Sequence, residues 1–82
     1  MTDLEQRAAQ LLPQIRYAPD MWHEPRAKFL YRVWKSDPLW NLTALEQADL
    51  WWLIWHYRRQ VDDADLVWRA DEVTNGVLAL RF

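Results

Sequence analysis

The chain contains no cysteine, one glycine and one serine, and its longest uninterrupted apolar run has six residues. The lack of cysteine excludes a disulfide framework and a thiolate metal site. A single glycine cannot form the glycine-rich loop that cradles a phosphate, and it argues against a sandwich of many short strands. Six apolar residues fall far short of the ~20 that span a bilayer. These absences favour a few long helices and a protein that does not cross a membrane.

The composition is instead dominated by apolar and aromatic side chains. Of the 82 residues, 51% are hydrophobic and seven are tryptophan, where average usage gives roughly one. A chain of this length forms one domain, residues 1–82, which buries roughly 60–65% of its surface. Residues 1–5 are polar and acidic, unlike a signal peptide, so we expect a cytoplasmic protein. The net charge of −2 does not by itself attract nucleic acid.

Four segments carry helix signals. A Thr-x-x-Glu capping box occurs twice, at Thr2 and at Thr43, and each predicts a helix start. Prolines and an Asn-Gly pair mark further boundaries, because proline stops a helix and glycine closes one. The predicted helices are a first that ends or kinks at Pro13, a second at about 25–35, a third at about 44–60, and a fourth that begins after Asp62 and closes at Asn75-Gly76.

These signals predict an all-α fold, a small bundle of three to four helices with a short extended C-terminal tail. The tail, residues 77–82, is apolar except for Arg81, so we expect it to pack on the bundle as an extended segment or as a single strand.

The predicted third helix is unusual because residues 50–55 are six consecutive apolar residues. Successive side chains of a helix advance by about 100°, so these six point all the way round the axis. Two apolar seams result, and Trp51 lies between them, so we expect neither seam to hide its ring fully. The first seam is Leu50, Ile54, Tyr57 and Val61, and the second is Leu45, Ala48, Trp52 and Trp55.

Two interpretations of this helix are compatible with each other. It is the central helix of the bundle, with Arg59 stacked over Trp55 in a cation–π contact of about 0.5–1 kcal/mol. Alternatively, one seam is an interface, because tryptophan, tyrosine and arginine dominate the energetics of protein interfaces. The predicted partner-binding residues are Trp51, Trp52, Trp55, Tyr57, Arg58 and Arg59, and the partner is another protein or a second copy of the chain in a homodimer.

Basic side chains form a second pattern. Lys28, Arg32 and Lys35 are spaced by four and three residues, which puts them on one helix face. Together with Arg58 and Arg59 they could bind single-stranded nucleic acid beside the aromatic rings. Cations at this spacing are also typical of the solvated face of an amphipathic helix. Nucleic-acid binding is therefore the alternative function.

Acidic side chains gather near the predicted fourth helix, and they are Asp62, Asp63, Asp65, Asp71 and Glu72. Aspartates at a helix start cap it and favour the positive end of its dipole. A calcium loop would need a glycine and regularly spaced oxygen ligands, which are missing. An acidic surface could instead imitate a phosphate backbone. We expect no metal ion and no cofactor.

The sequence holds no recognisable catalytic motif. His23-Glu24-Pro25 begins like a zinc-protease motif but lacks the second histidine. His56 lies between Trp55 and Tyr57 and is typical of a surface or interface residue, and Ser36 is the only serine. We therefore predict that the protein is not an enzyme and has no small-molecule substrate.

Residues 42–61, LTALEQADLWWLIWHYRRQV, resemble a pattern in short phage and prophage proteins. In that pattern a Leu-Thr helix start leads to an aromatic helix that ends in Tyr-Arg-Arg-Gln and a hydrophobic residue. The resemblance covers about a quarter of the chain and implies a mobile-element origin without an assigned activity. Small phage proteins without catalytic residues often occlude a host protein. The expected function is thus that of a non-catalytic protein-binding module, an inhibitor or accessory factor.

Overall fold

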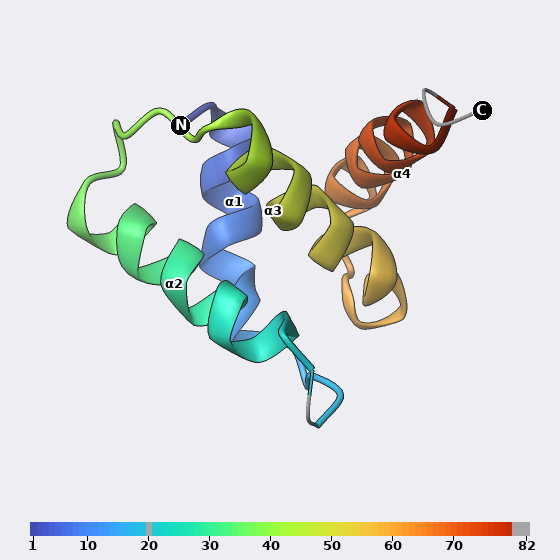
Figure 1. The fold of residues 1–82 in the computed structure, drawn as a ribbon, viewed down its shortest axis with the longest axis horizontal. Coiled ribbons are helices and arrows are strands. Elements are labelled where there is room, and N and C mark those ends of the chain that lie inside the picture. Colours follow the sequence, from blue (N-terminus) through green and yellow to red (C-terminus); the bar gives the residue numbers. More distant parts are fainter. Residues whose placement is uncertain (20, 80–82) are drawn as a thin grey trace.

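The computed structural model describes residues 1–19 and 21–79, with side chains as far as residue 75. The described residues form helices and no strands, which confirms the predicted all-α bundle. The elements are α1 (Asp3–Leu11), η1 (Leu12–Gln14), α2 (His23–Ser36), α3 (Ala44–His56), η2 (Arg58–Gln60) and α4 (Ala64–Ala79), where η denotes a 3₁₀ turn. α1 contacts the other three helices, and α3 packs most extensively on α4 (Figure 1).

Both predicted capping boxes are present. The Thr2 hydroxyl accepts from the Glu5 amide at 3.2 Å, and the Glu5 carboxylate accepts from the Thr2 amide at 2.9 Å. Thr43 and Glu46 repeat this exchange at the start of α3, at 3.1 and 2.9 Å. Each box satisfies backbone donors that a helix start leaves unpaired. The starts of α1 and α3 are therefore encoded locally, within four residues of sequence.

The start of α4 is joined to α1 by one aspartate. Asp63 Oδ1 accepts from the amides of Asp65 and Leu66, at 3.1 and 3.4 Å, as a helix N-cap does. The other carboxylate oxygen of Asp63 accepts from the Arg7 guanidinium of α1. This hydrogen bond is the main cause that raises the pKa of Arg7 above its ordinary value. Asp63 thus caps its own helix and positions it against α1.

α3 is shorter than predicted. It ends at His56, and residues 58–60 form η2 in place of the last helical turn. The hydroxyl of Tyr57 is held by the loop before α2, and the side chain of Gln60 exchanges two hydrogen bonds with the backbone of Arg16, at 2.8 and 3.0 Å. These contacts pull the chain away from the helix axis. In consequence Arg58, and not Arg59 as predicted, lies over the Trp55 ring at 4.8 Å.

α4 runs past Asn75-Gly76 to Ala79, so the predicted closure there is wrong. Asn75 Nδ2 donates to Asp71 Oδ1 at 2.9 Å, which supports the helix along its own surface. A single internal glycine costs only about 1 kcal/mol relative to alanine, too little to stop a helix packed on α3. The predicted extended tail is accordingly wrong for residues 77–79, and residues 80–82 lie outside the described residues. Among the described helices none combines the length and apolarity that crossing a membrane requires.

The core is built around α3. The first predicted seam, from Leu50 to Val61, is buried, and the six largest fully enclosed side chains are Leu12, Leu30, Leu50, Leu53, Ile54 and Leu66. Trp51 is only 3% exposed, so the expectation that its ring stays partly uncovered is wrong. α1, α2 and α4 all contact α3, and together they cover more of its circumference than two narrow seams. The central-helix interpretation of α3 is confirmed.

We expect Leu53→Ala to lower the free energy of unfolding by about 2–5 kcal/mol, because it leaves a cavity in a fully enclosed site. Leu45→Ala on the same helix is the matched control, since Leu45 is largely exposed and should change stability by less than about 1 kcal/mol. Urea unfolding followed by far-ultraviolet circular dichroism measures both. Equal losses in the two variants would contradict the assignment of α3 as the core helix.

Candidate functional site

The exposed large apolar side chains of α3 and of the start of α2 lie along neighbouring edges. On α3, Leu45 is 67% exposed and Trp52, seven residues later, is half-buried. On the α2 side, Trp22 is 48% and Phe29 is 37% exposed. The Trp22 and Trp52 ring centroids are 4.9 Å apart, which joins the two edges. The outer edge of α3 is therefore the second predicted seam, extended by α2.

A groove of about 650 Å³ lies between these edges; its lining is Trp22, Pro25, Arg26, Phe29, Leu45 and Asp49. We call it the α2–α3 groove. Arg26 Nε is 3.2 Å from Asp49 Oδ2, so an ion pair bridges the two helices. The same guanidinium lies 5.5 Å from the Phe29 ring centroid in a cation–π arrangement. The groove thus combines exposed rings with one charge of each sign.

A buried hydrogen-bond chain fixes the end of the groove at Trp22. His23 is only 4% exposed, and its Nδ1 is 2.6 Å from the Tyr57 hydroxyl. The Ala18 amide donates to the same hydroxyl oxygen at 2.9 Å, so Tyr57 joins the loop before α2 to His23. Burial lowers the pKa of His23 below its ordinary value, and the neighbouring His56 lowers it further.

Aromatic rings enclose this chain. His56 stacks on Trp52 with centroids 4.6 Å apart and planes 10° apart, and its ring lies 5.2 Å from His23. Tyr17 meets Tyr57 edge to face at 5.1 Å and donates its hydroxyl proton to the Leu12 carbonyl at 2.6 Å. Burial raises the pKa of Tyr17, so its phenol stays a neutral donor. The His23 ring contacts both Trp22 and Trp52, and the His56 ring contacts Trp52, so these imidazoles position the two tryptophan rings.

The chemistry available at this cluster is limited. His23 is buried and its Nδ1 is hydrogen-bonded to the Tyr57 hydroxyl, which leaves this nitrogen poorly placed to act as a base. Ser36 ends α2 while His23 begins it, so the two are roughly 20 Å apart along the helix. In the part of the chain that the structure describes, no three His, Cys, Asp or Glu side chains are placed to share a metal ion. The absence of enzymatic activity stays a prediction.

The predicted partner-binding residues are divided by the structure. Trp51 and Tyr57 are in the core, because they face α3's neighbours, and they cannot form a surface of the folded monomer. Trp52 and Trp55 are half-buried, and Arg58 and Arg59 are exposed. The structure adds Trp22 and Phe29, which were not predicted, and Leu45, which was predicted in the second seam but not among the partner-binding residues. Trp22, Arg26 and Phe29 are spaced by four and three residues, a pattern that would have indicated a second stripe on α2.

The predicted basic residues are likewise divided. Lys28, Arg32 and Lys35 are all exposed on α2, whereas Arg58 and Arg59 belong to η2. Gln60 of η2 binds the backbone of Arg16, an arginine that was not singled out from the sequence. Arg16 lines a second pocket together with Lys28 and Arg32, and the other three predicted cations do not line it.

Comparison of the chain with protein-family models, with curated proteins and with solved structures gives no match.

We expect the free energy of unfolding to fall as pH decreases below about 6.5, in the range where histidine ordinarily binds a proton. The unfolded chain binds that proton at His23 while the folded chain, with its lowered pKa, does not, so acid favours unfolding. Urea unfolding at pH 7.5 and pH 5.5 measures the decline, in a range where most carboxylates stay ionised.

His23→Asn should reduce this decline, because the titrating group is gone while a side-chain acceptor for Tyr57 remains. His56→Gln is the control, since it removes the exposed histidine and keeps His23. A decline of the same size in His23→Asn as in the wild type would contradict the role of His23.

Proposed function

We propose that this protein is a non-catalytic protein-binding module whose partner covers the α2–α3 groove. The observation that carries the proposal is the exposure of Trp22, Phe29 and Leu45 on adjacent edges around one groove. Scattered exposed apolar residues are ordinary on protein surfaces, but a contiguous set around a hollow is typical of an interaction site. Trp52, whose ring packs at a tilt against Trp22, makes the set continuous.

The groove supplies part of the energy that binding needs. Covering the roughly 100 Å² that each of these three side chains still exposes would contribute about 2–3 kcal/mol gross per side chain. Association costs about 4–15 kcal/mol of lost freedom, so a stable complex needs further contacts around the groove. Because the Trp22 ring already packs against the rings of His23 and Trp52, little side-chain freedom remains to be lost on binding.

The partner chemistry follows from the lining. An apolar helix face that carries one charge of each sign would fill the groove and meet Arg26 and Asp49. A second copy of this chain satisfies the same requirement, because these two residues can exchange partners across a two-fold axis. Origin in a phage or prophage, action as an inhibitor or accessory factor, and a cytoplasmic location belong to the same proposal. The alternative, nucleic-acid binding through Lys28, Arg32, Lys35, Arg58 and Arg59, stays a prediction.

We expect Phe29→Lys with Leu45→Lys to abolish association, because two ammonium groups cannot be desolvated inside an apolar contact. Light scattering over a range of concentrations measures self-association, and capture from a lysate of the native host followed by mass spectrometry measures a different partner. Leu39→Lys is the matched control, since Leu39 is exposed in the α2–α3 loop and does not line the groove.

The groove would be excluded as the interface by either of two results. The first is a double variant that keeps the mass profile and the captured proteins of the wild type. The second is a Leu39→Lys variant that loses association to the same degree.

A further inference from the structure

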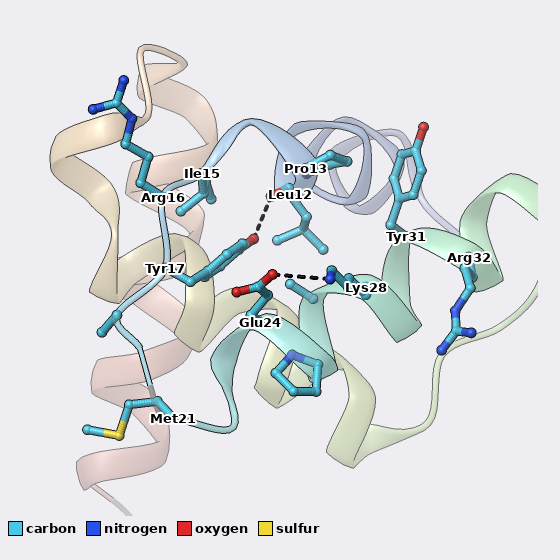
Figure 2. Close-up of a pocket in the computed structure, with 13 residues that line it drawn as sticks. Leu12, Pro13, Ile15, Arg16, Tyr17, Met21, Glu24, Lys28, Tyr31 and Arg32 are labelled. Carbon is cyan, nitrogen blue, oxygen red and sulfur yellow. Dashed lines mark hydrogen bonds and ion pairs between the residues drawn. The ribbon is translucent and has the colours of Figure 1, made fainter.

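The edge of α2 that faces away from α3 borders a larger hollow, of about 960 Å³ (Figure 2). It lies between α2 and the segment that contains η1 and residues 15–18. We call it the η1–α2 pocket. Its floor is aliphatic, because Leu12, Ile15 and Ala27 line it and are themselves buried. Pro13 and Pro25 also line it, so much of the surrounding backbone has a restricted φ.

The pocket is held open by contacts already described on its inner side. Tyr17 donates to the Leu12 carbonyl, which ties the loop back onto η1 at 2.6 Å. The Tyr17 ring also packs edge to face on Tyr57, whose hydroxyl binds the amide of Ala18. The wall opposite α2 is thus anchored to the end of α3. A ligand would meet a preformed surface, so the free-energy cost of ordering that surface on binding would be small.

The charge around the pocket is opposite to that of the whole chain. Three cationic side chains, Arg16, Lys28 and Arg32, line it with a single carboxylate, Glu24. Glu24 Oε1 is 3.1 Å from Lys28 Nζ, so this pair is largely neutral. Among the residues that the structure describes, Arg16 and Arg32 form no ion pair, although the chain as a whole has a net charge of −2. Figure 2 shows these two arginines on opposite sides of the pocket, with Leu12 and Tyr17 between them.

We propose that the η1–α2 pocket binds an acidic peptide segment of a partner protein, with an apolar side chain on the aliphatic floor and a carboxylate on each side. The two carboxylates would meet Arg16 and Arg32, whose planar guanidinium groups suit bidentate binding. This site lies on the other edge of α2 from the α2–α3 groove. This proposal rests on the proposed protein-binding function only because it assumes that the partner is a protein. The two sites can be tested separately.

Two other ligand classes fit the pocket less well. A single small carboxylate could meet only one arginine, because the two lie on opposite sides. Single-stranded nucleic acid binds by stacking its bases on open ring faces. Here the floor is aliphatic, and Tyr17 is half-buried with its hydroxyl turned to Leu12. The Tyr31 ring also lines the pocket, but it is packed against Trp34 and lies under Lys35.

The test uses the full chain and the blocked hexapeptide Asp-Glu-Leu-Phe-Glu-Asp in isothermal titration calorimetry. We expect saturable binding whose Kd rises at least fivefold between 20 and 200 mM NaCl, because exposed charges are screened. Arg16→Glu and Arg32→Glu should each raise Kd at least tenfold. Arg69→Glu, on α4 and outside the pocket, changes the net charge equally and should leave Kd within twofold. All three substitutions lie outside the core, and circular dichroism verifies that the variants fold.

Several outcomes would overturn the proposal. No binding by the wild type at 20 mM salt excludes the site, and so does equal binding of the neutral hexapeptide Asn-Gln-Leu-Phe-Gln-Asn. An equal effect of Arg69→Glu and Arg32→Glu would assign binding to net charge alone. A twelve-residue oligothymidylate that binds more tightly than the peptide and depends on Arg16 and Arg32 would assign the pocket to nucleic acid. Phe29→Lys with Leu45→Lys should not change peptide binding, so failure here and failure of the α2–α3 groove are distinguishable.

Discussion

The hydroxyl of Tyr57 is the contact on which both candidate surfaces depend. It stands where α3 ends, accepts from the Ala18 amide and lies 2.6 Å from His23 Nδ1. One oxygen therefore ties the end of α3 to the loop after η1 and to the first residue of α2. Each of these bonds joins positions more than 30 residues apart in sequence. Because the oxygen and its partners are buried or half-buried, leaving any of them unpaired costs about 1–3 kcal/mol.

The bonds of the Tyr57 hydroxyl support one candidate surface on each side of α2. Toward α3, His23 contacts the rings of Trp22 and Trp52, and Trp22 lines one end of the α2–α3 groove. Toward η1, the anchored Ala18 and the Tyr17 ring form the wall of the η1–α2 pocket. α2 is shared by the two surfaces. Its inner stripe, with Ala27 and Leu30, is core, and its two edges face different hollows of opposite character, one aromatic and one basic.

Much of the fold could be predicted from local patterns. The capping boxes at Thr2 and Thr43 need only residues three positions apart, so they form whatever the rest of the chain does. Leu50 and Ile54 of the first seam were also recognisable, because their spacing of four residues is a property of the helix itself. The end of α3 was not, since side-chain bonds from Tyr57 and Gln60 to a distant loop override the local preference. The same holds for α4, where packing on α3 outweighs the signal of Asn75-Gly76.

The candidate sites show which features follow from local sequence patterns and which follow from the packing of the helices. Three features follow from periodicity along single helices: the helical fold, the apolar girth of residues 50–55, and the shared face of Lys28, Arg32 and Lys35. Packing between helices buries Trp51 and Tyr57, leaves Trp22, Phe29 and Leu45 exposed, and brings Arg16 to the α2 cations. Whether an apolar ring is covered depends on which helices pack beside it. That arrangement is set by contacts between residues far apart in sequence, which a local pattern does not contain.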